Sequence, residues 1–216
     1  MTAKQRDIEE SYSHIAGAYA EHFFDELRHK PFDRALLDVF ADQVRGTGPV
    51  LDVGCGPGQS ARALRERGID VTGVDLAPEM IAEAKRRLPN IPFRVGSMLA
   101  LEDANASYAG LVALYAIVHF HREELTQACR EFFRVLRPSG LALASFHLGT
   151  EVVHRNELFG KPVNLDFVCF ERAIVEGAFV AAGFRIEAYL ERAPHTEIEH
   201  PTQRAYILAR KPYSAG

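Results

Sequence analysis

The sequence has 216 residues, of which 47% are hydrophobic and 25% charged, and its formal net charge is −4. This length suits roughly one domain, and the hydrophobic fraction is high enough for a packed core, so intrinsic disorder is excluded. The negative charge disfavours a general attraction to nucleic acid or anionic membranes, and three widely spaced cysteines with no signal-like N-terminus indicate a cytoplasmic protein.

The N-terminal part of the chain predicts two helices. Residues 4–29 are rich in helix formers, and their aromatic residues recur at spacings of about one or two helical turns. Pro31 interrupts this pattern, and Asp33 is a favourable N-cap for a second helix that ends before Gly46.

From residue 50 onward, short apolar runs alternate with amphipathic segments. The predicted strands are 50–53, 69–75, 91–95, 111–118 and 141–146. The predicted helices between them are 59–67, 78–88 and 121–137, the last stopped by Pro138. Such an alternation predicts a parallel sheet with helices on both faces.

The last third of the chain follows a different pattern. Residues 148–170 show little helical period and contain a turn at 160–162, whereas 171–182 predict a helix that ends at Gly183. Residues 185–192 and 204–210 predict a hairpin that adds antiparallel strands to the sheet. Charged pairs are expected to hold this hairpin, among Arg192, Glu197, Glu199 and Arg204.

A glycine-rich turn after the first strand is the most informative segment. Gly54, Gly56 and Gly58 stand between a strand and a helix, where backbone amides approach a ligand closely. Their spacing is not the G-x-G-x-x-G of dinucleotide-binding enzymes, because Gln59 replaces the last glycine, so a nicotinamide oxidoreductase is disfavoured. Asp75 ends the second strand, where a carboxylate accepts both hydroxyls of a ribose.

These segments resemble the class I S-adenosylmethionine-dependent methyltransferases, specifically the small-molecule branch called type 11. The resemblance covers essentially the whole chain and is sharpest at residues 51–58, 73–80, 112–119 and 134–140. It implies an α/β, Rossmann-like, doubly wound sheet of seven strands in the order 3-2-1-4-5-7-6, with strand 7 antiparallel. It further implies a single domain, 1–216, with an N-terminal helical lid at 1–45 and a cap insertion after strand 5 at 149–170.

The resemblance also implies the cofactor, S-adenosyl-L-methionine with S-adenosyl-L-homocysteine as product, and no metal. Asp75 then faces the ribose, and the main-chain carbonyls of Ala113 and Leu114 face the methionyl amino group. The residues implied to bind the cofactor are Tyr12, Asp52, Gly54, Cys55, Gly56, Gly58, Gln59, Asp75, Leu76, Met80, Ser97, Met98, Ala113 and Leu114. Ser97 departs from the usual acidic residue of relatives, so we expect a weaker contact with the adenine amino group.

Methyl transfer requires alignment of the reactants and exclusion of water, and a base only where the acceptor must lose a proton. His119 is the candidate general base, and a packing or substrate-shaping role is its alternative. Candidate substrate-binding residues are Tyr19, His119, His147 and Arg192, with core packing the alternative for Tyr19 and charge pairing the alternative for Arg192. A metal site at His147, Glu151 and His154 is disfavoured, because their spacing matches no ligand signature.

The function expected from the sequence is methyl transfer to an oxygen, nitrogen or carbon atom of a small molecule by in-line displacement. Two alternatives stay open: a protein that binds the cofactor without transferring a methyl group, and a methyltransferase of RNA or protein. We expect no nucleic-acid or membrane partner, and the oligomeric state, monomer or homodimer, is left open.

Overall fold

The computed structural model describes residues 2–195 and 199–213, so Glu197 lies outside the described residues. Its main sheet has seven strands in the order β3-β2-β1-β4-β5-β9-β8. β1 to β5 are parallel to one another, and β9 pairs antiparallel with both β5 and β8. The topology predicted from the sequence is confirmed. The strand bounds are β1 Val50–Val53, β2 Val71–Asp75, β3 Phe93–Val95, β4 Tyr108–Leu114, β5 Leu136–Leu148, β8 Arg185–Arg192 and β9 Gln203–Arg210.

Helices cover both faces of the sheet because its central strands are apolar on both sides. On β1, Leu51 packs into one core with the side chains of α5 and α6, whereas Val50 packs into another with those of α2 and α3. Successive residues of a strand point to opposite faces, so both faces need a cover. The helix bounds are α2 Pro31–Val44, α3 Gln59–Glu66, α4 Pro78–Arg87, α5 Arg122–Val135 and α6 Arg172–Ala182.

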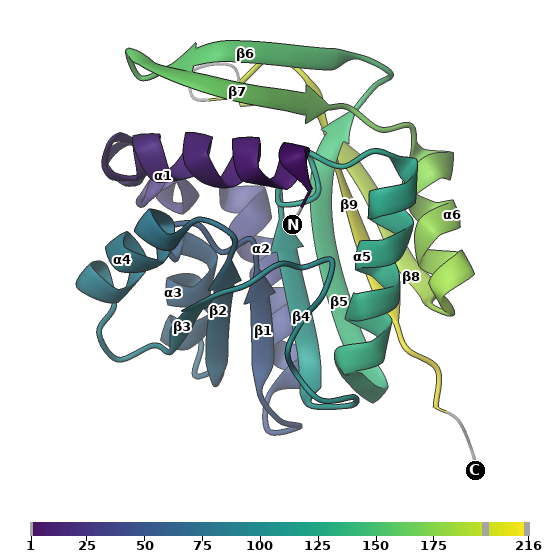
Figure 1. Cartoon of the computed structure of the whole chain (residues 1–216). Coiled ribbons are helices and arrows are strands. Elements are labelled where there is room, and N and C mark those ends of the chain that lie inside the picture. The colour runs from purple at the N-terminus through teal and green to yellow at the C-terminus, as the bar shows by residue number, and fades with distance from the viewer. Residues whose placement is uncertain (1, 196–198, 214–216) are drawn as a thin grey trace.

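Two further elements lie over the edge at which the parallel strands end. The long helix α1, Ala3–Phe23, crosses this edge, and a separate hairpin lies over α1 (Figure 1). The hairpin consists of β6, Val152–Leu158, and β7, Lys161–Val168. A short 3₁₀ helix, Glu26–His29, joins α1 to α2. Ile15 of α1 packs between Met80 of α4 and Leu165 of β7, so one apolar cluster ties α1 to its neighbours above and below.

Helix α2 begins three residues earlier than the sequence predicts. Pro31 occupies its first turn, where its missing N–H costs nothing, so the expected N-cap at Asp33 is wrong. Asp33 instead lies inside the first turn and is buried. Its carboxylate accepts hydrogen bonds from the Tyr206 hydroxyl, at 3.0 Å, and from the guanidinium of Arg192, at 2.8 Å. These partners are remote in sequence, so the local pattern could not reveal them.

Strands β4 and β5 also differ from their predicted bounds. β4 ends at Leu114 rather than at residue 118, because Tyr115 adopts a left-handed backbone conformation with φ of 52°. β5 is longer than predicted at both ends, and its last residues, His147 and Leu148, pair with Arg204 and Gln203 of β9. No helix within residues 2–195 and 199–213 has both the length and the apolar composition that crossing a membrane requires.

Candidate functional site

A cavity of about 690 Å³ lies at the carboxyl-end edge of the sheet. Its walls come from the ends of β1, β2, β4 and β5, from the start of β9, and from α1 and the β6–β7 hairpin. Ligands of α/β sheets bind in this position, outside the carboxyl ends of the strands. The cavity is therefore where the site residues predicted from the sequence should meet.

The glycine-rich turn forms part of the cavity wall. Gly54 and Gly56 both have left-handed φ values, 65° and 52°, and both line the cavity. A Cβ on Gly54 would come within 2.5 Å of the Cβ of Ala116, so this position has no room for a side chain. Gly58 has a different role: it caps α3, and a Cβ there would meet Leu88 at 2.8 Å, on the side away from the cavity. Two of the three glycines thus bring bare backbone to the cavity.

Asp75 connects this turn to the end of β2. One carboxylate oxygen, Oδ2, accepts a hydrogen bond from the backbone N–H of Gly56 at 2.8 Å, and Oδ1 accepts one from Ala77 at 2.9 Å. Each carboxylate oxygen has about two acceptor sites, so both retain capacity for a ligand. Burial raises the pKa of Asp75, and the backbone N–H donors partly oppose this shift.

Gln59 brings an unpartnered acceptor to the cavity. Its amide nitrogen contacts Glu26 at 3.4 Å, but its Oε1 is buried without a hydrogen-bond partner in the described part of the chain. Buried polar atoms are rarely left unpaired, so a ligand with an N–H donor would satisfy it. Asp52 also has an unpartnered oxygen, Oδ2, and burial raises the pKa of this carboxyl well above its usual value. Asp52 lies behind the wall rather than on it.

The cavity brings together most of the residues that the sequence suggests. Those that line it are Tyr12, Tyr19, Gly54, Gly56, Gln59, Asp75, Leu76, Met80, Ser97, Met98, Leu114, His119 and His147. Those outside its lining are Asp52, Cys55, Gly58, Ala113 and Arg192. In the described residues, no group of three or more His, Cys, Asp or Glu side chains is arranged to hold a metal.

His119 and Tyr12 form a hydrogen-bonded pair in the cavity wall. The Nδ1 atom of His119 lies 2.6 Å from the carbonyl oxygen of Asp166 on β7, and its Nε2 lies 2.8 Å from the Tyr12 hydroxyl. A carbonyl only accepts, so Nδ1 holds the proton and Nε2 accepts from Tyr12. Burial lowers the pKa of His119 to about 4. His119 is therefore neutral at pH 7, with its one lone pair engaged.

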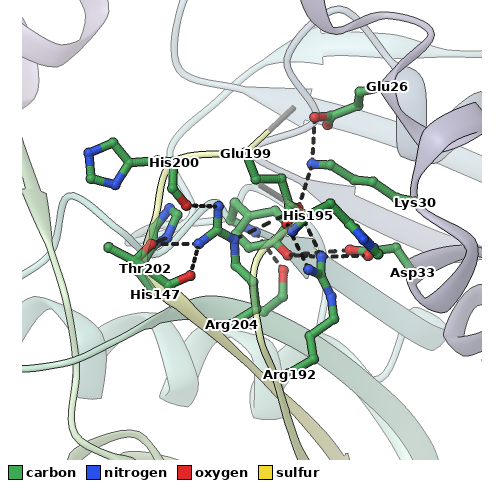
Figure 2. Close-up of polar contacts among 12 residues, drawn as sticks. Glu26, Lys30, Asp33, His147, Arg192, His195, Glu199, His200, Thr202 and Arg204 are labelled. Atoms are coloured by element: carbon green, nitrogen blue, oxygen red, sulfur yellow. Dashed lines mark hydrogen bonds and ion pairs between the residues drawn. The ribbon is translucent and has the colours of Figure 1, made fainter. Parts of the chain in front are cut away.

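Arg192 belongs to a buried ion-pair network. Its guanidinium donates to Asp33 at 2.8 Å and to both carboxylate oxygens of Glu199, at 2.7 and 2.8 Å (Figure 2). Glu199 also contacts Lys30 at 3.3 Å and Arg204 at 3.8 Å. The hydrogen bonds from Arg192, supported by these two positive charges, hold the pKa of Glu199 well below its usual range despite burial. These contacts favour the charge-pairing alternative for Arg192 over a substrate contact.

Sequence reasoning missed several residues at the end of the cavity farthest from Asp75. They are Glu26, Lys30, Tyr115, Arg155, His200 and Thr202. They come from the turn before α2, the end of β4, the hairpin and the approach to β9. No spacing signal links residues so far apart in the chain. They meet because the tertiary fold places these segments around one cavity, and the pairing of β5 with β9 positions the approach to β9 among them.

Comparisons with known proteins agree with this geometry. A family model described as a methyltransferase domain matches residues 50–140, the segment that holds the glycine-rich turn and Asp75. A demethylmenaquinone methyltransferase of Chlorobaculum parvum is 39% identical over 165 residues, which are 75% of this chain and 63% of that protein. The chain thus spans less than two thirds of the length of this relative.

Solved structures share the fold at lower identity. An S-adenosylmethionine-dependent methyltransferase of Methanosarcina mazei superposes with a TM-score of 0.70 at 18% identity, over 77% of this chain and 93% of that one. The [4+2]-cyclase SpnF superposes with a TM-score of 0.65 at 22% identity, over 84% and 81% of the two chains. At these identities the likeness concerns the fold, and the second structure is named for a reaction other than methyl transfer.

Proposed function

We propose that the chain is a class I S-adenosylmethionine-dependent methyltransferase, and that it transfers a methyl group from S-adenosylmethionine to a small molecule. One observation carries the proposal: a single cavity has the glycine-rich turn and Asp75 at one end and a separate polar cluster around His147 at the other. Its volume of about 690 Å³ lies in the upper part of the usual range for small-molecule sites, about 300–1,000 Å³. The cavity thus has room for two ligands.

The residues at the Asp75 end fit the cofactor. Asp75 has acceptor capacity left for the two ribose hydroxyls, and the unpartnered Oε1 of Gln59 suits the methionyl ammonium group. Leu76 and Met80 offer apolar side chains to the adenine. When bound, the cofactor supplies a methyl group on a sulfonium sulfur. In the in-line displacement this sulfur leaves as a neutral thioether, which is a good leaving group.

The protein contributes alignment and exclusion of water. Helix α1 and the β6–β7 hairpin close the cavity above the strand ends, and they are held together by the hydrogen bond from the Asn164 N–H to the Ser11 hydroxyl, at 2.9 Å. A covered site strengthens polar interactions with the reactants and keeps them in register. This cover also favours a small molecule over RNA or a folded protein as acceptor. We propose residues 1–45 as the lid and 149–170 as the cap of one domain.

In this proposal His119 orients Tyr12 rather than removing a proton from the acceptor. A pKa of about 4 makes His119 a weak base at neutral pH, and its Nε2 already accepts a hydrogen bond from the Tyr12 hydroxyl. The substrate-shaping alternative for His119 is thus the one that the contacts support. The acceptor then either needs no deprotonation or reaches the site already ionised.

Cofactor binding without methyl transfer is the second candidate function, because the candidate base, His119, already accepts a hydrogen bond from Tyr12. Cofactor binding is tested by calorimetry with S-adenosylhomocysteine and, in parallel, with NAD. We expect S-adenosylhomocysteine to bind and NAD not to bind. Binding of NAD alone would refute the proposal, and binding of S-adenosylhomocysteine without any methyl transfer would favour the second candidate.

A further inference from the structure

The far end of the cavity contains a chain of hydrogen bonds that ends in a histidine. His147, the penultimate residue of β5, pairs in register with Arg204 of β9. Thr202 precedes β9 and lies between the two side chains, and all three residues line the cavity (Figure 2). The Thr202 hydroxyl oxygen contacts Nη1 of Arg204 on one side and Nδ1 of His147, at 2.8 Å, on the other.

The hydrogen bonds of Thr202 favour one tautomer of His147. A guanidinium only donates, so Arg204 donates to the Thr202 oxygen and cannot receive the hydroxyl proton. The only other partner of that hydroxyl in the described chain is Nδ1 of His147. The oxygen has a second lone pair, so a protonated Nδ1 could donate to it as well, but the hydroxyl O–H would then have no acceptor among the described residues. The arrangement that pairs this O–H has Nδ1 of His147 as its acceptor. A neutral imidazole that accepts at Nδ1 carries its proton at Nε2.

The surroundings keep the ring neutral. Burial lowers the pKa of His147 to about 3, and the nearby positive charge of Arg204 adds to this shift. Protonation at both nitrogens would also place an N–H against the hydroxyl that the Arg204 guanidinium already polarises. His147 thus has one defined donor, the Nε2–H.

This donor has no hydrogen-bond partner among the described residues, although the ring lines the cavity. The nearest buried carboxylate is already engaged, since both oxygens of Glu199 accept from Arg192 and one also contacts Lys30. The buried polar atoms that lack a partner do not include this nitrogen, so it is open to the cavity, where a ligand atom with a lone pair can accept its proton. The hairpin contributes four apolar or aromatic side chains to the cavity lining, together with the charged Arg155 and Glu157; the four are Val153, Leu158, Phe159 and Phe167.

We propose that the methyl acceptor is an amphipathic small molecule whose oxygen, in a carboxylate or a carbonyl group, accepts the Nε2–H of His147. Thr202 and Arg204 are positioning residues, because they act by holding the ring in this tautomer. The apolar part of the acceptor packs against the hairpin. This inference rests on the proposed function, and it names the chemistry of the substrate that the second half of the cavity takes.

The tautomer is tested by nitrogen-15 NMR of the histidine rings, with long-range couplings that report which ring nitrogen is protonated. We expect His147 to carry its proton at Nε2 in the wild-type protein and in Thr202→Ser. In Thr202→Val, which removes the hydroxyl at nearly constant shape, we expect a mixture of tautomers. Thr126→Val is the matched control, since Thr126 is only partly buried and its hydroxyl bonds to Arg122 of its own helix. A wild-type ring protonated at Nδ1 overturns the inference.

The chemistry of the acceptor is tested with three probes that share one ring: benzoate, acetophenone and benzylamine. Each is titrated into protein saturated with S-adenosylhomocysteine while the His147 resonances are followed. We expect benzoate or acetophenone to bind and to shift the Nε2–H signal, and the stronger of the two identifies a charged or a neutral oxygen. Preferential binding of benzylamine, or of none of the three, overturns the inference.

Substitutions of His147 distinguish the contribution of its N–H donor to probe binding from the contribution of the size of its ring. His147→Gln retains an N–H donor near the position of Nε2, whereas His147→Ala has none. The loss of one hydrogen bond predicts about five- to tenfold weaker probe binding in His147→Ala, with most of it restored in His147→Gln. His29→Gln, at an exposed histidine, should change nothing. Equal loss in both His147 variants would overturn the donor role. Failure of S-adenosylhomocysteine to bind would refute the proposed function alone, because the tautomer is measured without it.

Discussion

Substitution of Asp75 by asparagine should weaken cofactor binding severely. Both carboxylate oxygens accept a backbone N–H, from Gly56 at 2.8 Å and from Ala77 at 2.9 Å. An asparagine has one acceptor oxygen, so its amide nitrogen must face one of these N–H groups, and one ribose hydroxyl loses its charged acceptor. A hydrogen bond to a charged group contributes about 1.5–3 kcal/mol. One backbone N–H of the turn also loses its acceptor, so we expect a loss of about 2–4 kcal/mol in binding free energy, or roughly 30- to 1,000-fold in Kd.

Isothermal titration calorimetry with S-adenosylhomocysteine measures this loss directly. The matched control is Asp70→Asn, because Asp70 precedes the same strand but is exposed and makes only a long contact with Arg65, at 3.5 Å. The control should bind as the wild type does. An unchanged Kd in Asp75→Asn, in protein with an unchanged thermal midpoint, would refute the assignment of Asp75 to the ribose.

Three further outcomes are expected. Glu199→Gln removes one of the two buried carboxylates that pair with Arg192, and should lower the free energy of unfolding by about 3 kcal/mol in urea denaturation; the same change at the partly exposed Glu187 should cost less than about 1 kcal/mol. Because the pKa of His119 falls from 6.5 unfolded to about 4 folded, the unfolded chain binds more protons between these values, and stability should fall as pH is lowered through this range. His119 contributes up to about 1.4 kcal/mol per pH unit to this slope, and a foldable His119→Asn variant should lose that contribution and keep the one from His147, whose pKa is lowered to about 3. In His119→Ala, kcat should fall about tenfold with little change in cofactor Kd, because Tyr12 loses its partner; a wild-type kcat/KM profile with an ionisation near pH 6.5 that disappears in this variant would instead identify His119 as a base.

The strand order and the cofactor half of the cavity could be predicted because their signals are local. The apolar run before Gly54 and the carboxylate at Asp75 lie within one βαβ unit, where the spacing along the chain fixes their positions in space. The same holds for the αL cap at Gly183, whose φ of 106° ends α6 at the residue predicted from the sequence. The glycine positions and the alternation of apolar strands with amphipathic helices therefore predict most of the strand order and of the cofactor half of the cavity.

The other half depends on contacts between distant segments. The sequence predicts Asp33 as a helix N-cap, but its carboxylate accepts hydrogen bonds from Arg192 and Tyr206 of the last hairpin. The sequence carries no signal at Thr202, because a single threonine belongs to no periodic pattern or motif. Its role follows from its position between His147 and Arg204 in the folded chain. Long-range pairing of β5 with β9, rather than any motif, builds this part of the cavity.

The central claim is tested most directly by methyl transfer itself. The protein is incubated with S-adenosylmethionine labelled in the methyl group and with a small-molecule extract of the cells that carry it, supplemented with aromatic and aliphatic carboxylic acids and ketones. Mass spectrometry then follows the label. The account predicts a labelled small molecule formed in equal amount with S-adenosylhomocysteine, and its loss in Asp75→Asn. Label that stays on the cofactor throughout, in protein that binds S-adenosylhomocysteine, would contradict it.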